Sequence, residues 1–320
     1  MSHAEHRFTS MGSAARIQLE SPALSGAALE RHVAEIRALL QVVERTLSRF
    51  DPRSELSACN HDLRTEVPCS SLMRRFAEAV AEAGARSGGL VDATLLGPLE
   101  RQGYTASRAG VAAASLEEAL VAAPPRRAAR PHPARAWARV GAGDGTIVRP
   151  PGVRLDSGGL GKGLAADMAA ALLPAGVRFA ISCGGDLAVG APPARPWDVT
   201  VHDARTGEDV HRLRVRAGGV ATSGIPARLW QRDDGGFAHH LLDPSTGEPA
   251  WTGLVAATAV APTALDAEVL AKTAVLSGAA AARRMLARRG GVLQHDDGRI
   301  ELVAGPPVAH LARPRPRVAA

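Results

Sequence analysis

Only two lysines occur in this chain of 320 residues, although lysine and arginine together number 38. Lys162 lies in a glycine-rich stretch over residues 155–163, and Lys272 lies one helical turn after Glu268. A compact ammonium is hard to replace with a planar guanidinium where space is tight. The two positions therefore indicate sites that require a point charge. The alternative is that the composition is poor in lysine and that the positions of the two lysines are due to chance.

The segment around Lys162 has the pattern of a tight turn into a helix, with glycines at positions 158, 159, 161 and 163. At a helix start, free backbone N–H groups and the positive end of the dipole favour an anion such as a diphosphate. The spacing is neither a P-loop nor a dinucleotide fingerprint. The glycines alone leave a structural turn and an anion site equally open.

A histidine lies before a turn in the second half of the chain. His240 comes three residues before Asp243, in the string His-Leu-Leu-Asp-Pro-Ser-Thr-Gly over residues 240–247. A histidine in a strand next to an exposed loop can act as a base near neutral pH. For a single histidine a structural role is the more common one, so this string needs support from elsewhere in the chain.

Six short segments, including these two regions, form an ordered series: residues 48–56 with Asn60, 89–94, 155–167, 182–186, 221–224 and 240–247. Their order and spacing resemble the motifs of the FAD:protein FMN transferases, the ApbE family, from about Met11 to Gly278. Residues 155–167 are similar to the family's DLGGIAKGYAVD motif, and residues 240–247 to its HIIDPxTG motif. Six motifs in order are much more specific than any one of them.

The resemblance implies an α+β, T-fold-like architecture of the ApbE type, with mixed, mostly antiparallel sheets and packed helices. It also implies FAD binding, the use of magnesium, and transfer of the FMN half of FAD to a Thr or Ser hydroxyl of a partner flavoprotein, with release of AMP. Attack on a diphosphate requires a deprotonated hydroxyl, a stabilised leaving group and neutralised phosphate charge.

The resemblance also assigns roles to individual residues. His240 would be the general base for the acceptor hydroxyl, and Asp156 and Lys162 would contact the flavin nucleotide. The residues expected to line the FAD pocket are Met11, Leu90, Val91, Asp92 and Leu241. The candidate metal ligands are Gly159, through its carbonyl, and Glu268.

At its C-terminal motif the chain departs from the family, whose Asp and Thr metal ligands are replaced here by Glu268 and Lys272. A protonated lysine cannot ligate a metal. One interpretation is an ordinary helical ion pair, worth about 0.3–0.5 kcal/mol if exposed. We prefer the interpretation that the Lys272 ammonium occupies or abuts the metal position, is held by Glu268, and meets the FAD diphosphate directly. Asp266 or the Gly159 carbonyl could still recruit magnesium.

Two functions follow from this departure. The first is an FMN transferase with an altered metal site. The alternative is a FAD-binding ApbE-like protein with weak or lost transferase activity, because FAD binding should survive the change better than transfer. An arginine-rich nucleic-acid binder is a remote third possibility.

The elements that must position these residues are helices mixed with short strands, an order that predicts an α+β fold rather than a doubly wound sheet. Helices are expected over residues 27–47, 70–84, 116–123, 161–173, 265–276 and 279–288. Strands are expected over residues 14–20, 146–155, 177–182, 186–190, 197–201, 211–215, 219–223, 239–242 and 254–260, with a last hairpin of 291–293 and 300–303. We expect one ApbE-like domain over residues 1–305, with an Arg/Pro-rich loop over 124–136, and a flexible Pro/Arg tail over 306–320.

The composition limits the partners and the compartment. The formal net charge is +6, but much of the excess lies in the Arg/Pro-rich loop and tail, and aromatic residues make up only 3% of the chain. A stacking platform for single-stranded nucleic acid is therefore poorly supplied, and we expect no nucleic-acid partner. Three cysteines without a CxxC pair fit a reducing compartment. Without a signal-like N-terminus or an apolar run of about 18 residues, we expect a cytoplasmic protein that does not insert into membranes.

Overall fold

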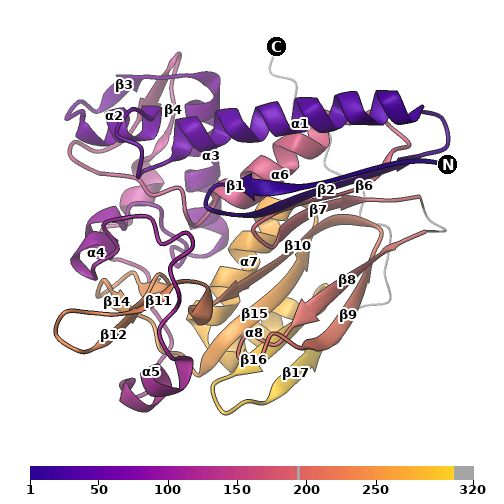
Figure 1. Ribbon diagram of the computed structural model, residues 1–320. Helices are drawn as coiled ribbons and strands as arrows, with labels where there is room; N and C mark the ends of the chain where they lie inside the picture. Colours follow the sequence, from indigo (N-terminus) through magenta and orange to yellow (C-terminus); the bar gives the residue numbers. More distant parts are fainter. Residues whose placement is uncertain (193–194, 306–320) are drawn as a thin grey trace.

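An eight-stranded antiparallel sheet is the centre of the computed structural model, which describes residues 1–192 and 195–305 (Figure 1). The strand order is β1-β2-β6-β7-β10-β15-β16-β17, and every neighbouring pair is antiparallel. The strands are β1 (Ser2–Ser10), β2 (Ser13–Ser21), β6 (Arg178–Cys183), β7 (Asp186–Gly190), β10 (Ala217–Gly224), β15 (Leu254–Ala261), β16 (Gly291–His295) and β17 (Ile300–Val303). The predicted α+β class is confirmed, whereas the predicted tail over 306–320 lies outside the described residues.

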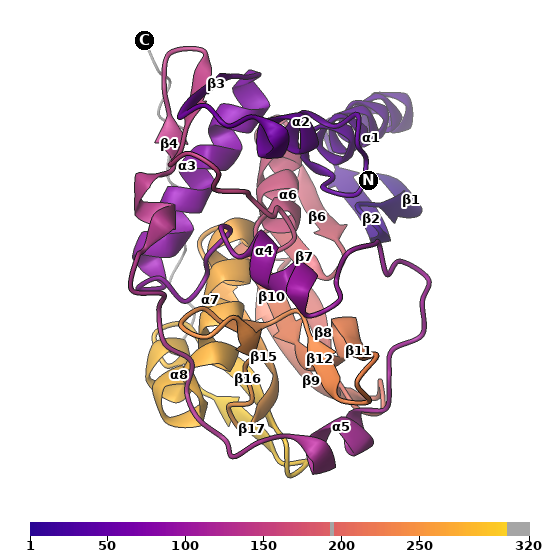
Figure 2. The ribbon, with the colours of Figure 1, turned by 90° about the vertical axis from the view of Figure 1, so that its left-hand side faces the viewer.

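Four helices cover one face of this sheet: α1 (Gly26–Leu47), α6 (Gly161–Ala171), α7 (Ala264–Ser277) and α8 (Ala279–Leu286). Figures 1 and 2 show α7 and α8 beside β10 and β15, and α6 between them and α1. Six apolar residues of α1 recur at helical spacing and are buried: Leu29, Val33, Ile36, Leu40, Val43 and Leu47. This stripe packs on β1, β2 and α6 in the main core, as expected for an amphipathic helix on a sheet.

The opposite face of the sheet is covered near its middle by a hairpin of β8 (Trp197–His202) and β9 (Asp209–Val215). Trp197 and Val215 of the hairpin cluster with Ala180 and Val189 of the sheet. Because side chains alternate between the two faces of a strand, Ala180 lies in this cluster while its neighbour Ile181 lies in the main core.

The long segment between α1 and α6 builds the part of the molecule beside the helices and the sheet (Figure 2). It contains α2 (Glu55–His61), β3 (Glu66–Pro68), α3 (Ser71–Arg86), α4 (Leu96–Arg101), α5 (Leu116–Ala122), a 3-10 turn (Ala136–Arg139), β4 (Gly141–Ala142) and β5 (Thr146–Val148). Strands β3, β5 and β4 form a small sheet against α3. The predicted loop over 124–136 has no helix or strand before residue 136, and its backbone is held by hydrogen bonds such as Ala129 N–H to the Leu276 carbonyl (2.8 Å).

Short elements after β10 complete the fold. They are a 3-10 turn (Ile225–Arg228), β11 (Leu229–Gln231), β12 (Phe237–His239), β13 (Leu242–Asp243) and β14 (Glu248–Pro249). The predicted strand over 239–242 is wrong as a single strand: β12 pairs with β11, β13 pairs with β14, and residues 240–241 form the bend between them. The predicted strand over 146–155 is also too long, because it ends before the Pro-Pro-Gly sequence at 150–152.

Among the described residues, no helix is long and apolar enough to cross a membrane.

Candidate active site

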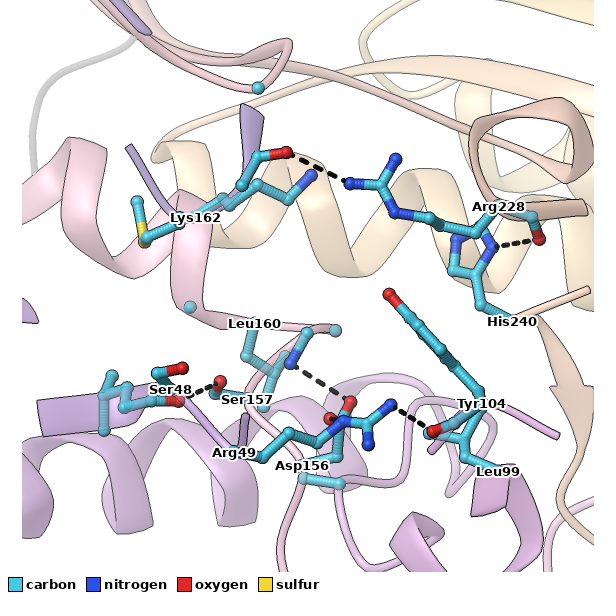
Figure 3. A pocket seen from close by; sticks show the side chains of 18 of the residues that line it. Ser48, Arg49, Leu99, Tyr104, Asp156, Ser157, Leu160, Lys162, Arg228 and His240 are labelled. Atoms are coloured by element: carbon cyan, nitrogen blue, oxygen red, sulfur yellow. Dashed lines mark hydrogen bonds and ion pairs between the residues drawn. The ribbon is translucent and has the colours of Figure 1, made fainter. Parts of the chain in front are cut away.

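A cavity of about 580 Å³ lies where the C-terminal end of α1, the start of α6, α7 and the bend at residues 240–241 meet (Figure 3). Its lining contains every predicted site residue except Glu268, which lies buried behind it. These residues come from positions 11 to 272 and are brought together only by the fold. The fold therefore brings these residues to one cavity, and their roles stay predictions.

The start of α6 forms one wall of the cavity. The Gly161 N–H donates to the Ser157 carbonyl (2.7 Å), and the Ser157 hydroxyl donates to the Leu47 carbonyl at the end of α1 (2.6 Å). Lys162 on the first turn of α6 forms an ion pair with the buried Asp186 (3.0 Å). Although burial opposes its charge, the Asp186 and Glu268 carboxylates raise the pKa of Lys162 above its ordinary value. Lys162 is therefore a permanent cation at the positive end of a helix.

Arg49, which the sequence analysis did not single out, holds Asp156 on the opposite wall. Its Nε lies 2.7 Å from Asp156 Oδ1, and its guanidinium lies between two aromatic rings, 4.0 Å from the Phe50 centroid and 4.5 Å from the Tyr104 centroid. Tyr104 in turn contacts Trp230, with the ring centroids 5.3 Å apart and the planes tilted by 41°. Burial raises the pKa of Asp156, and the Arg49 charge opposes that shift. This wall therefore places the Tyr104 ring beside the Arg49–Asp156 ion pair (Figure 3).

His240 lines the cavity with one ring nitrogen already committed. Its Nδ1 lies 3.4 Å from the Arg228 carbonyl, which can only accept, so Nδ1 carries the proton and Nε2 has the free lone pair. Burial, with the neighbouring His239 and Lys272 charges, lowers the pKa of His240 well below its ordinary value. The ring is therefore neutral at pH 7, the form that a general base requires. Figure 3 shows His240 beside Arg228, another residue that the sequence analysis missed.

The acidic residue of the same motif has a structural role in this geometry. Asp243 Oδ1 accepts hydrogen bonds from the Arg130 N–H (3.1 Å), the Ser245 N–H (3.0 Å) and the Ser245 hydroxyl (2.8 Å). These bonds shape the turn after His240 and join it to the Arg/Pro-rich loop. Asp243 therefore positions the histidine segment.

The predicted pocket residues Met11, Leu90, Val91 and Leu241 line the cavity together with Asp92. Asp92 Oδ1 accepts from the Thr94 N–H (2.8 Å) and hydroxyl (2.6 Å), whereas Oδ2 is buried and has no hydrogen-bond partner in the described part of the chain. Burial raises the pKa of this carboxyl group. A buried acceptor without a partner costs free energy, and a ligand that donates a hydrogen bond would recover it.

Glu268 and Lys272 form a buried pair on α7. Glu268 has no exposed surface, and Lys272 is 7% exposed. Glu268 Oε1 accepts from the Lys272 ammonium at 2.9 Å, and Oε2 accepts from the Gly163 N–H at 2.8 Å. Burial and the Asp186 charge raise the pKa of Glu268, while Lys272 and Lys162 act against that shift. The interpretation of an ordinary exposed helical pair is wrong, because folding places both groups in the interior.

This arrangement does not fit a magnesium ion at Gly159 and Glu268. Both Glu268 oxygens are already bonded, and Asp266 forms an ion pair with Arg86 of α3. The described residues contain no group of three or more His, Cys, Asp and Glu side chains that could hold a metal ion. A hard cation prefers several oxygen ligands, and here it would also face the Lys162 and Lys272 ammonium groups.

Comparison with known proteins gives a consistent result. A sequence model of the ApbE family matches residues 11–294. A FAD:protein FMN transferase of Treponema pallidum is 31% identical over 269 residues, which are 78% of this chain and 73% of that protein. The crystal structure of an ApbE protein from Thermotoga maritima has a TM-score of 0.76 at 24% identity, covering 94% of this chain and 97% of that one. The flavin transferase ApbE of Vibrio cholerae has a TM-score of 0.70 at 21% identity, covering 95% and 97%.

Matches of this extent show both the fold and the family. Five of the six motif segments that carry the sequence resemblance contribute residues to the cavity lining: 48–56, 89–94, 155–167, 182–186 and 240–247. The chain belongs to the ApbE family.

Proposed function

We propose that this chain is a FAD:protein FMN transferase, which moves FMN from FAD to a Thr or Ser hydroxyl of a partner flavoprotein and releases AMP. The observation that carries the proposal is the neutral His240, whose free Nε2 belongs to the same cavity as Lys162, Lys272 and Arg228. A base for a hydroxyl and a set of cations for a diphosphate are the two requirements of the reaction. The relative from Treponema pallidum carries the same name.

In this proposal FAD lies along the cavity with its diphosphate at the start of α6. The positive end of the helix dipole and Lys162 suit an anion there, and the Tyr104 and Phe50 rings suit contact with an aromatic ring. Asp92 Oδ2, buried without a partner among the described residues, is an acceptor for a donor on FAD. Met11, Leu90, Val91 and Leu241 supply the surrounding contacts.

The proton transfer follows from the His240 tautomer. Nε2 takes the proton of the acceptor hydroxyl as its oxygen bonds to the flavin-side phosphorus. The bond between that phosphorus and the bridging oxygen breaks, and AMP leaves with the bridging oxygen. Cations beside the diphosphate stabilise the charge that moves onto AMP.

The partners and the compartment belong to the same proposal. The acceptor is a flavoprotein with an exposed Thr or Ser target, and no nucleic acid takes part. The cytoplasm remains the predicted location, with the free thiols of Cys59, Cys69 and Cys183 as its support.

Mass spectrometry of the acceptor tests the proposal. The purified protein is incubated with FAD and a flavoprotein domain that carries an acceptor Thr, with magnesium and with a chelator. We expect a covalent FMN adduct on the acceptor and free AMP in the supernatant, and no adduct when the acceptor Thr is changed to Val. Bound FAD without an adduct under any metal condition would instead support the alternative of a FAD-binding protein that has lost transfer.

A further inference from the structure

The Lys272 ammonium is placed to contact a ligand in the cavity. The side chain lines the cavity although only 9% of it is exposed, and a Cβ at Gly159 would lie 3.8 Å from its Cε. An ammonium has three N–H donors. Over residues 1–192 and 195–305, its Nζ has one hydrogen bond, to Glu268 Oε1 at 2.9 Å. Two donors therefore remain for an anion beside the start of α6.

Glu268 holds this ammonium in a fixed position. Its second oxygen accepts from the Gly163 N–H at 2.8 Å, which ties the carboxylate of α7 to the backbone of α6. A Cβ at Gly163 would lie 2.8 Å from the same oxygen, so the close approach of the two helices requires glycine there. The Glu268–Lys272 pair is thus part of the contact between α6 and α7 beside the cavity.

The charges around the pair favour an anionic ligand over a further cation. Lys162 is paired with Asp186, and Lys272 with Glu268, so the two ion pairs together are neutral. Arg228 also lines the cavity, and within the described residues it has no carboxylate partner. These five groups together therefore carry a charge of +1 before any metal binds, because Arg228 is the one cation among them without a carboxylate partner in the described part of the chain. A diphosphate compensates this charge, whereas a divalent cation would increase it.

We propose that the Lys272 ammonium, held by Glu268, binds the FAD diphosphate directly and makes FAD binding by this chain independent of a divalent cation. The inference rests on the proposed function, because it concerns the substrate of that same cavity. Hydrogen bonds from an ammonium to phosphate oxygens are charge-assisted and strong. The ammonium does not coordinate as a metal does, so it supplies binding and charge without Lewis-acid chemistry.

The test is a FAD titration monitored by isothermal calorimetry, once in a buffer with magnesium and once in a buffer with EDTA. For the native chain we expect dissociation constants that agree within about twofold in the two buffers. Lys272→Met gives a side chain of similar length without the charge. It should weaken FAD binding about 10- to 100-fold in both buffers. Riboflavin, which has no phosphate, should bind as it does to the native chain. Lys272→Thr frees one Glu268 oxygen and adds a hydroxyl, so its FAD affinity should fall in EDTA and recover in magnesium.

Two results would overturn the inference: a native FAD affinity that falls tenfold or more in EDTA, or a Lys272→Met variant that binds FAD as tightly as the native chain. Removal of Lys272 alone leaves a buried charge, so if Lys272→Met does not fold, the Glu268→Gln/Lys272→Met double variant takes its place. FAD that fails to bind in either buffer defeats the proposed function as well. Magnesium-independent FAD binding without adduct formation defeats transfer alone and leaves this inference standing.

Discussion

At the residue scale, folding gives two adjacent histidines opposite surroundings. His239 is fully buried, and its ring meets Trp251 edge to face at 4.7 Å, whereas His240 lines the cavity. His239 Nδ1 accepts from the Leu241 N–H (3.3 Å), so it shapes the bend that presents its neighbour. His239 is therefore a positioning residue, and the candidate base is His240.

We expect His240→Gln to lower the rate of FMN transfer by about 10²- to 10⁴-fold, the usual range for loss of a general base. FAD affinity should change little, because the amide keeps the size and polarity of the ring. The measurement compares adduct formation with the FAD dissociation constant. Since the pKa of His240 is lowered well below 6.5, the native rate should also stay level as the pH falls from 8 to 6.5. A rate that halves near pH 6.5 would contradict a neutral, buried base.

His239 predicts a loss of stability in acid. Burial lowers its pKa to about 3, against about 6.5 in an unfolded chain. Between these values the unfolded state binds the extra proton, so stability is full above pH 6.5 and falls as the pH drops towards 3. His239→Asn, whose amide oxygen can accept the Leu241 N–H, should reduce the slope of unfolding free energy between pH 6.5 and 5 by about 1.4 kcal/mol per pH unit.

Urea unfolding at several pH values measures this slope. The matched control is His3→Asn, because His3 is exposed; its slope should equal that of the native chain. Equal slopes for all three proteins would show that His239 does not carry the effect.

Sequence motifs could predict the site residues that lie in a continuous stretch of recognisable residues. Lys162 and His240 belong to continuous strings and were found from them. Tyr104 and Arg228 lie in segments without a recognised motif and reach the cavity only through the fold. Spacing also placed Glu268 and Lys272 on one helix face, but it could not show that this face is buried.

At the element scale, the decisive contact is the one between α6 and α7, which carry Lys162 and Lys272. Asp167 of α6 accepts from the Ala264 N–H (2.8 Å) and the Leu265 N–H (2.9 Å) at the start of α7. Gly163 supplies the close approach one turn earlier. The spacing of the two lysines thus depends on Gly163 and Asp167, neither of which lines the cavity.

Gly163→Ala should separate the two helices. Its Cβ would lie 2.8 Å from Glu268 Oε2, from the Ala264 carbonyl oxygen and from the Leu265 Cα. We expect the variant to lose about 1–3 kcal/mol of unfolding free energy, as overpacked cores do. Gly161→Ala on the same helix is the control, because its Cβ would meet only Ser157 at ordinary distances of 3.6 Å or more. The control should stay within about 1 kcal/mol of the native chain in thermal or urea unfolding. Equal losses in both variants would contradict the account of this contact.

The elements that the sequence predicted well are those with a strong apolar period. The α1 helix was expected over 27–47 and observed as Gly26–Leu47, because its buried stripe repeats over about five turns. Strand β1 (Ser2–Ser10) was not predicted, because an edge strand with alternating polar residues has little apolar signal. The short helices α2 and α4 were also missed. Short helices depend on tertiary contacts more than on propensity.

At the scale of the whole molecule, some strands that are neighbours in the sheet, such as β2 and β6, lie far apart in sequence. Ile17 of β2 pairs with Ile181 of β6, and the segment between them supplies both the start of α6 and the Arg49–Asp156 pair on the opposite wall of the cavity. Further lining residues, among them Arg228, His240 and Lys272, come after position 226. A ligand in the cavity therefore contacts both halves of the chain, and it cannot stay bound if either half unfolds.

This connection predicts that FAD stabilises the entire fold. A ligand that binds only the native state adds about 2.7 kcal/mol at one hundred times its dissociation constant, and the whole unfolding transition should move to higher temperature with one midpoint. Riboflavin at the same concentration should stabilise less, because it leaves the cationic end at Lys162, Lys272 and Arg228 without an anion. Differential scanning calorimetry with each ligand gives the comparison. If riboflavin and FAD raised the midpoint equally, the phosphates would contribute nothing to stabilisation. The cations at the start of α6 would then only pair with the protein's own carboxylates.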